Sequence, residues 1–141
     1  VPIAMQADVV VWVPGNTTST KESRTKLAPT VSLDDAVFNI SRSSLFVAAM
    51  ATGDFGALAE AAQDRLHQNV RLAIVPETKR AMRAAVEAGA YASWLSGSGP
   101  TMACMVDPLR APDVLSALPS GGVGHHLRID VNGPVVSERA S

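Results

Sequence analysis

A glycine-rich stretch between two apolar runs is the part of this 141-residue sequence whose residue types most directly suggest ligand chemistry. Residues 96–101 read SGSGPT, and apolar runs at 91–95 and 102–106 flank them. Glycines at 97 and 99 allow positive backbone φ angles and a close approach to a ligand. Consecutive N–H groups in such a loop, helped by hydroxyl groups, can form a concavity that binds anions. The pattern predicts either an anion-binding loop between two strands or a tight hairpin connection without a ligand.

A second polar feature lies on the helix that the apolar spacing predicts for residues 54–71. At about 100° per residue, the apolar residues of this segment gather on one side of the helix. Asp64, His67, Gln68 and Arg71 gather on the opposite side. If the helix is continuous, these four residues form one stripe, which is either a solvated face or part of a site.

The other predicted elements form a pattern of sheet strands with helices between them. Strands are expected at 8–13, 91–95, 102–106 and 126–131. Helices are expected at 20–27, 32–52, 77–88 and 111–118. Residues 119–124 are expected to form a flexible turn, and 126–137 could instead be a hairpin turning at 132–133. The order β, helices, β, β, α, β predicts an α+β fold of the ferredoxin-like split βαβ type, with extra helices in the first crossover.

Composition indicates one domain, with residues 1–141 as its extent, and argues against several partners. The net charge is −1 without a long charge run, which disfavours nucleic acid and anionic membranes as partners. No apolar run reaches the length of about 20 residues that a membrane-spanning helix needs. Cys104 is the only cysteine, so we expect a buried, inert thiol and a cytoplasmic protein. His125 and His126 lack nearby cysteine or carboxylate partners, so no metal site is predicted.

Four motifs in a fixed order carry a family resemblance that covers residues 9–106. The motifs are TKESR at 20–24, AVFNISR at 36–42, DRLHQNVR at 64–71 and the stretch from Gly89 to Thr101 that ends in SGSGPT. The last motif resembles the third signature of the GHMP small-molecule kinases. All four together resemble the C-terminal half of the homoserine kinases within that family. The resemblance implies the ferredoxin-like architecture of the GHMP kinase C-terminal domain.

The resemblance also implies a reaction, the transfer of the γ-phosphoryl group of ATP to the hydroxyl of homoserine in threonine biosynthesis. It assigns Arg24 and Arg71 to the substrate carboxylate, for which the planar guanidinium is well suited. It places Thr20 near the transferred phosphoryl group as the candidate catalytic residue, and Gly97 near the substrate. Thr20 lies four residues before Arg24, so one helical turn would bring both to the same face.

On the side of ATP, the resemblance implies that Ser98 and Gly99 lie near the phosphates as backbone donors. Kinases of this family bind ATP and Mg²⁺ mainly through an N-terminal domain with a Pro-x-x-x-Gly-Leu-Gly-Ser-Ser-Ala loop, and these 141 residues contain no such loop. We therefore expect this chain to be the substrate-side domain, to need an ATP-binding N-terminal domain as its partner, and to be inactive alone.

Three alternatives remain open at the level of sequence. The chain could belong to another GHMP-type kinase that acts on a mevalonate-pathway intermediate or a sugar. It could be a non-catalytic ferredoxin-like module that binds an amino acid. It could also be a dimerisation module, because an open sheet edge or an exposed helix face can pair across a two-fold axis. A homodimer is compatible with each of these alternatives.

Overall fold

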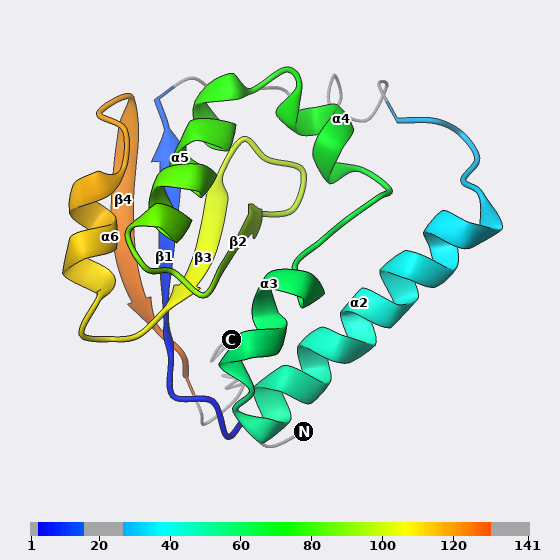
Figure 1. The fold of residues 1–141 in the computed structure, drawn as a ribbon. Coiled ribbons are helices and arrows are strands. Elements are labelled where there is room, and N and C mark those ends of the chain that lie inside the picture. The colour runs from blue at the N-terminus through cyan, green and yellow to red at the C-terminus, as the bar shows by residue number, and fades with distance from the viewer. Residues whose placement is uncertain (1–2, 16–26, 131–141) are drawn as a thin grey trace, which may run out of the picture.

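Residues 3–15 and 27–130 are described by the computed structural model, and they contain one four-stranded antiparallel sheet (Figure 1). The strands are β1 (Asp8–Pro14), β2 (Ala92–Leu95), β3 (Met102–Val106) and β4 (Gly122–Arg128). They lie in the order β2-β3-β1-β4, and each neighbouring pair is antiparallel. This order is that of the ferredoxin-like split βαβ fold, so the predicted α+β class is confirmed.

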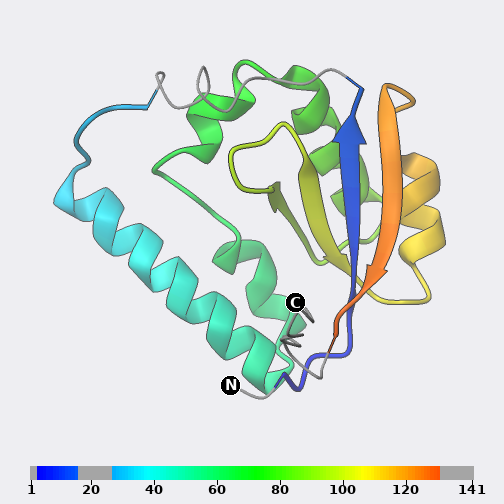
Figure 2. The same ribbon diagram turned by 180° about the vertical axis from the view of Figure 1, so that it is seen from behind.

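Helices cover the two faces of the sheet unequally. They are α2 (Leu33–Thr52), α3 (Leu58–Ala61), α4 (Gln68–Leu72), α5 (Pro76–Glu87) and α6 (Ala111–Ala117), with a 3₁₀ turn at Phe55–Ala57. Seen from behind, the strands lie in front of α5 and α6, which pack on one face (Figure 2). Part of the opposite face packs on α3 and on the C-terminal end of α2. In the part of the chain that the structure describes, no helix is both long and apolar enough to cross a membrane.

Alternating side chains of β1 explain the principal core. Val10 and Trp12 point toward α5 and α6 and are fully buried, together with Cys104 of β3. The indole N–H of Trp12 donates to the carbonyl oxygen of Pro119 at 3.0 Å, so the ring is buried without an unpaired donor. Small residues on α5, such as Ala81 and Ala85, let this helix approach the sheet closely.

The long first-crossover helix is confirmed together with both of its predicted ends. The Ser32 hydroxyl accepts a hydrogen bond from the Asp35 N–H at 3.1 Å, which caps the start of α2. Gly53 ends the helix with a φ of 73°, a conformation that favours glycine. The predicted strand at 8–13, the helix at 77–88 and the helix at 111–118 also agree with β1, α5 and α6.

The single helix predicted for residues 54–71 is wrong. The chain forms the 3₁₀ turn and the short helix α3, leaves helical geometry after Ala62, and resumes as α4 at Gln68. The carboxylate of Asp64 accepts hydrogen bonds from backbone N–H groups within the intervening segment, and Asn39 of α2 binds the same carboxylate. These contacts offer the backbone an alternative to helical hydrogen bonds, so the expected continuous polar stripe does not form.

The last strand begins earlier than the sequence predicts, at Gly122 instead of residue 126. A Cβ atom built on Gly122 would lie 2.5 Å from Cε2 of Trp12, so glycine is required where β4 crosses the indole. Glycines that read as a flexible turn therefore belong to the sheet. The alternative hairpin at 132–133 and the predicted helix at 20–27 lie outside the described residues, apart from Leu27.

Candidate functional site

The glycine loop (residues 96–101) connects the antiparallel strands β2 and β3, as the sequence predicts. Two backbone hydrogen bonds close it: the Ser96 N–H donates to the Thr101 oxygen at 2.8 Å, and the Gly99 N–H donates to the Ser96 oxygen at 3.0 Å. Both glycines have positive φ angles, 57° at Gly97 and 73° at Gly99. The loop is therefore a tight turn whose backbone conformation depends on glycine at both positions.

The two glycines differ in their surroundings. A Cβ atom built on Gly97 has no atom of residues 3–15 or 27–130 within 4 Å, so this side of the loop is open with respect to the described residues. A Cβ atom built on Gly99 would lie 2.8 Å from Cδ1 of Leu95, a buried side chain at the end of β2. Gly97 thus leaves room for a ligand against the backbone, while Gly99 lets the loop pack onto its own strand.

Arg71 is buried against the glycine loop and does not lie on a solvated helix face. It is only 8% exposed, and its Nη1 donates to the carbonyl oxygen of Gly97 at 3.1 Å. Within the described residues, its buried Nε has no hydrogen-bond partner. A buried guanidinium with an unused donor is unusual, because burying such a group without partners costs free energy. The structure therefore brings together two of the predicted site residues, Arg71 and Gly97.

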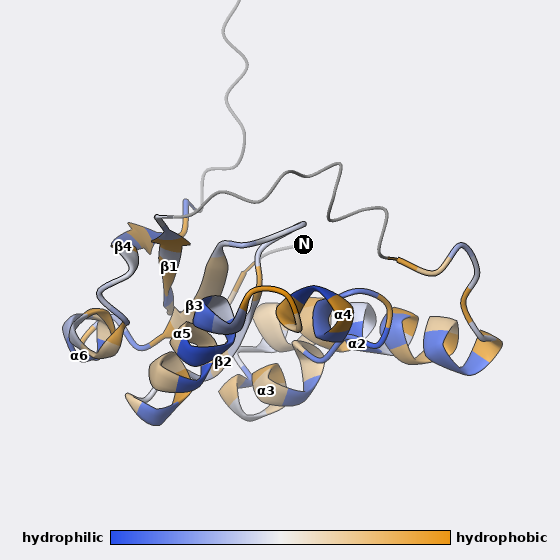
Figure 3. Ribbon diagram, turned by 90° about the horizontal axis from the view of Figure 1, so that it is seen from above, coloured by the Kyte–Doolittle hydropathy of each residue, from blue (hydrophilic) through white to orange (hydrophobic). Residues whose placement is uncertain are grey.

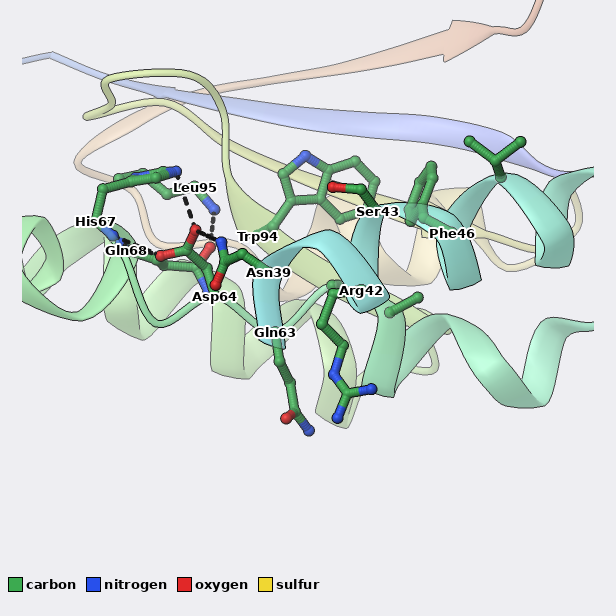
Figure 4. A pocket seen from close by; sticks show the side chains of 13 residues that line it. Asn39, Arg42, Ser43, Phe46, Gln63, Asp64, His67, Gln68, Trp94 and Leu95 are labelled. Atoms are coloured by element: carbon green, nitrogen blue, oxygen red, sulfur yellow. Dashed lines mark hydrogen bonds and ion pairs between the residues drawn. The ribbon is translucent and has the colours of Figure 1, made fainter. Parts of the chain in front are cut away.

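Asp64 organises the segment that leads into α4 (Figure 4). Its Oδ1 accepts from the backbone N–H groups of Leu66, His67 and Gln68 at 3.0, 2.7 and 2.8 Å. Its Oδ2 accepts from Nδ2 of Asn39 at 2.7 Å. Burial by itself would raise the pKa of Asp64, but the hydrogen bonds from these donors outweigh it and hold the pKa below its ordinary value. Asp64 is thus an ionised anchor that positions α4 and, with it, Arg71.

His67 lies beside the Asp64 carboxylate. Its Nε2 is 3.4 Å from Oδ2 of Asp64, and its Nδ1 is buried without a partner among the described residues. The ring forms part of the wall of a pocket of about 460 Å³ between α2, residues 61–68 and β2. Trp94 and Phe46, in edge-to-face contact at 5.7 Å, form an apolar wall of the same pocket. The residue pattern of the sequence gives no signal for this pocket.

Gln68 makes a contact with β2 that the sequence does not predict. Its Oε1 accepts a hydrogen bond from the Leu95 N–H at 2.7 Å (Figure 4). Because β2 is an edge strand, this side chain satisfies a backbone donor that has no neighbouring strand. The pattern of residues near 64–71 contains no signal for it, since the two groups lie 27 residues apart.

The remaining predicted residues fall into two groups. Ser98 and Gly99 lie in the same loop as Gly97, so the structure places all three loop candidates together. Thr20 and Arg24 lie outside the described residues. Among residues 3–15 and 27–130, there is no group of three His, Cys, Asp or Glu side chains that could hold a metal ion.

The surroundings of Cys104 and His126 indicate structural roles for both residues. Burial raises the pKa of the Cys104 thiol to about 11, although a hydrogen bond with the Val10 backbone lowers it slightly. The thiol stays protonated and is not a nucleophile at neutral pH. Nε2 of His126 lies 2.6 Å from Oδ2 of Asp8, so His126 does have a carboxylate partner, contrary to the expectation from sequence, because the pairing of β4 with β1 brings together residues 118 positions apart.

The fold and the glycine loop define a class of protein. Residues 46–124 match the family described as "GHMP kinases C terminal", and the chain belongs to this family. The family resemblance that the sequence motifs predict is therefore confirmed.

Within this family, homoserine kinases are among the proteins that match this chain in sequence. The chain is 42% identical over 115 residues to a homoserine kinase of Desulfitobacterium hafniense, an alignment that covers 82% of this chain and 39% of that protein. It is 50% identical over 93 residues to a homoserine kinase of Moorella thermoacetica, covering 66% of this chain and 31% of that protein. The chain thus spans less than half the length of these relatives.

Solved structures show the same fold. A homoserine kinase from Cytophaga hutchinsonii superposes with a TM-score of 0.85 at 21% identity, covering 93% of this chain and 44% of that one. A phosphomevalonate kinase from Streptococcus pneumoniae, in complex with phosphomevalonate and AMPPNP, superposes with a TM-score of 0.68 at 10% identity, covering 83% of this chain and 37% of that one. At these identities, the likeness concerns the fold.

Proposed function

We propose that this chain is the substrate-side domain of an enzyme that transfers the γ-phosphoryl group of ATP to the hydroxyl of homoserine. The observation that carries the proposal is the buried Arg71 guanidinium, which contacts Gly97 and keeps an unused Nε donor. A carboxylate is the natural partner for such a group, because two parallel N–H···O bonds match the planar fork of arginine. Homoserine carries a carboxylate, and both relatives compared above by sequence are homoserine kinases.

The family resemblance suggests a role for each loop residue. Arg71 would hold the substrate carboxylate, and the open side of Gly97 leaves room for the substrate beside the loop. The Ser98 N–H would donate to the phosphates of ATP, which enters with Mg²⁺. The Gly99 N–H already donates to the Ser96 oxygen, so Gly99 would shape the loop and would not bind the phosphates. Phosphoryl transfer depends chiefly on positioning and on stabilising charge, so a rigid loop is the form of assistance that this domain can give.

Other parts of the proposal rest on the resemblance. Thr20 and Arg24 would complete the site near the transferred phosphoryl group and the substrate carboxylate. The phosphate-binding half and Mg²⁺ ligands would come from an N-terminal domain, since the relatives are more than twice as long as the aligned stretch. We expect a cytoplasmic enzyme that can form a homodimer. We expect no turnover by this chain alone.

A second candidate is a GHMP kinase with another substrate. Phosphomevalonate kinase shares the fold, and phosphomevalonate also carries a carboxylate. A panel of acceptors that contains homoserine, mevalonate, phosphomevalonate and galactose separates the two readings, because each kinase should be selective for its own acceptor.

The role of Arg71 is tested by Arg71→Ala in an enzyme that contains this chain and its ATP-binding half. Loss of a charge-assisted hydrogen bond should cost on the order of 2–4 kcal/mol, seen as a large rise in the KM for homoserine with a smaller change for ATP. Arg80→Ala is the matched control, because Arg80 is an exposed arginine on α5 that pairs with Glu77. An unchanged KM for homoserine in Arg71→Ala would overturn the assignment.

A further inference from the structure

Thr78, in the first turn of α5, contacts the glycine loop through its side-chain hydroxyl. Its side chain is fully buried, and its hydroxyl donates a hydrogen bond to the carbonyl oxygen of Pro100 at 2.6 Å. Threonine is rarely buried this completely without a specific polar partner, because its hydroxyl must be satisfied. The contact joins residues 22 positions apart, and neither the sequence motifs nor the proposed chemistry uses it.

Thr78 is one of three side chains that hold the loop at successive points. Gln68 accepts from the Leu95 N–H at the end of β2, Arg71 donates to the Gly97 oxygen, and Thr78 donates to the Pro100 oxygen. We call these three contacts the loop clamp. All three side chains come from α4 and α5, so these two helices together support the whole turn.

The two carbonyl contacts set the direction of two amide groups. In a planar trans peptide, the C=O and the N–H point in opposite directions. Because the Gly97 oxygen faces Arg71, the N–H of Ser98 is directed to the other side of the loop. Because the Pro100 oxygen faces Thr78, the N–H of Thr101 is likewise directed away from α5. The clamp therefore determines which way the loop presents its donors.

We propose that Thr78 is a positioning residue for the phosphoryl-transfer site: it does not touch the substrate but orients the 100–101 peptide and thereby the glycine loop. This inference rests on the proposed function for its kinetic consequence, and on the structure alone for its effect on the loop. Arg71 binds the loop and the proposed substrate at once. Thr78 binds only the loop, so the two roles are separable by mutation.

The test compares Thr78→Val and Thr78→Ala, which remove the hydroxyl, with Thr78→Ser, which keeps it. Ser93→Ala is the matched control, because the Ser93 hydroxyl also bonds a backbone oxygen, that of Met82 on α5 at 3.0 Å, but at a distance from the loop. Using two variants without the hydroxyl keeps the comparison valid if one of them folds poorly.

The first readout is hydrogen exchange of the loop amides in this chain, with thermal unfolding measured in parallel. We expect exchange at Ser96 and Gly99, whose N–H groups donate hydrogen bonds within the loop, to become about tenfold faster in Thr78→Val and Thr78→Ala, and to stay near the original rate in Thr78→Ser and Ser93→Ala. Equal exchange in the Thr78 variants and in Ser93→Ala would overturn the positioning role, whatever reaction the enzyme catalyses.

The second readout is steady-state kinetics with homoserine and ATP in the enzyme that includes the ATP-binding half. We expect Thr78→Val to lower kcat about tenfold with little change in the KM for homoserine, because Arg71 still holds the carboxylate while the loop is misoriented. Thr78→Ser should restore kcat. A kcat in Thr78→Val equal to that of Ser93→Ala would overturn the kinetic role, whereas absence of homoserine turnover in the unmutated enzyme would overturn the proposed function instead.

Discussion

The glycine loop and the outer half of α2 (residues 33–44) differ in how much their structure depends on contacts with distant residues. The loop has irregular backbone, yet the three side chains of the loop clamp bind it and the adjoining end of β2. The outer half of α2 is regular helix, yet Leu33, Val37 and Ile40 are 78%, 55% and 67% exposed. In Figure 3, this helix carries both apolar and polar residues and extends away from the sheet. The contrast shows that regular structure follows from local sequence, while irregular structure needs distant partners.

The physical reason lies in the backbone hydrogen bonds. A helix satisfies its own N–H and C=O groups, so α2 needs only a cap at Ser32 and a stop at Gly53. A tight loop leaves several of these groups to other partners, and in this molecule Gln68, Arg71 and Thr78 supply them. Mutations near the loop should therefore disturb stability much more than mutations on the outer half of α2.

The largest effect is expected for Gly99→Ala. Alanine at a φ of 73° is strained, and its Cβ would lie 2.8 Å from Cδ1 of Leu95, which is only 3% exposed and cannot move aside freely. We expect the free energy of unfolding to fall by about 3 kcal/mol, measured by urea denaturation.

Gly97→Ala is the control for this variant, because Gly97 has a similar φ but a Cβ built on it contacts none of the described residues. Its expected loss is about 1 kcal/mol, from backbone strain alone. Equal losses for the two variants would show that contact with Leu95 is unimportant to the loop.

Asp64→Ala should have the next largest effect, with a loss of about 2 kcal/mol at neutral pH, because three backbone donors and the Asn39 amide lose their acceptor. The effect should depend on pH. Since the pKa of Asp64 in the folded protein lies below its ordinary value of 3.8, its stabilising contribution is complete above that value and declines as the pH falls through the lowered pKa.

Urea denaturation of both proteins across the acid range measures this dependence, and the two stabilities should converge at low pH. Asp113→Ala is the control, since Asp113 forms an exposed ion pair with Arg110 and should change the stability by less than about 0.5 kcal/mol. A constant difference between the original protein and Asp64→Ala at every pH would contradict the role of the ionised carboxylate.

A smaller effect is expected for Gln68→Met, which keeps the length of the side chain and removes the acceptor for the Leu95 N–H. An edge-strand donor that can reach water loses about 1 kcal/mol of stability when its partner is removed. Asn69→Met, at the exposed neighbouring position, controls for the added apolar surface. Hydrogen exchange at the Leu95 amide checks the mechanism directly, and it should accelerate only in Gln68→Met.

The smallest effect is expected for Ile40→Ser on the outer half of α2. Isoleucine and serine have similar helix propensities, and the Ile40 side chain is largely exposed, so the stability should change by less than about 0.5 kcal/mol. The far-ultraviolet circular dichroism spectrum and the urea midpoint measure this. A loss above about 1 kcal/mol would show that this face is buried in solution, and the contrast with the loop would then disappear.

Several features were predictable from the sequence because their signals are local. The cap at Ser32, the stop at Gly53 and the glycine-rich turn between two apolar runs all depend on residues that are neighbours in the chain. The ferredoxin-like order followed from these elements, and the family followed from the ordered motifs. The site residues Arg71 and Gly97 were named by resemblance, without a reason in the local pattern for their contact.

Only the tertiary structure decided how the chain between α3 and α5 runs and what it holds. The periodicity of residues 54–71 favours one helix, but Asp64 binds Asn39, 25 residues earlier, and the chain is not helical around Asp64, between α3 and α4. This break turns Arg71 from a surface position into a buried one, and it brings α4 and α5 beneath the glycine loop. The hydrogen bond of Thr78 to Pro100 has the same character. Local sequence specifies which backbone groups a segment can satisfy by itself, whereas the groups left over are satisfied by whichever distant side chains the fold brings near.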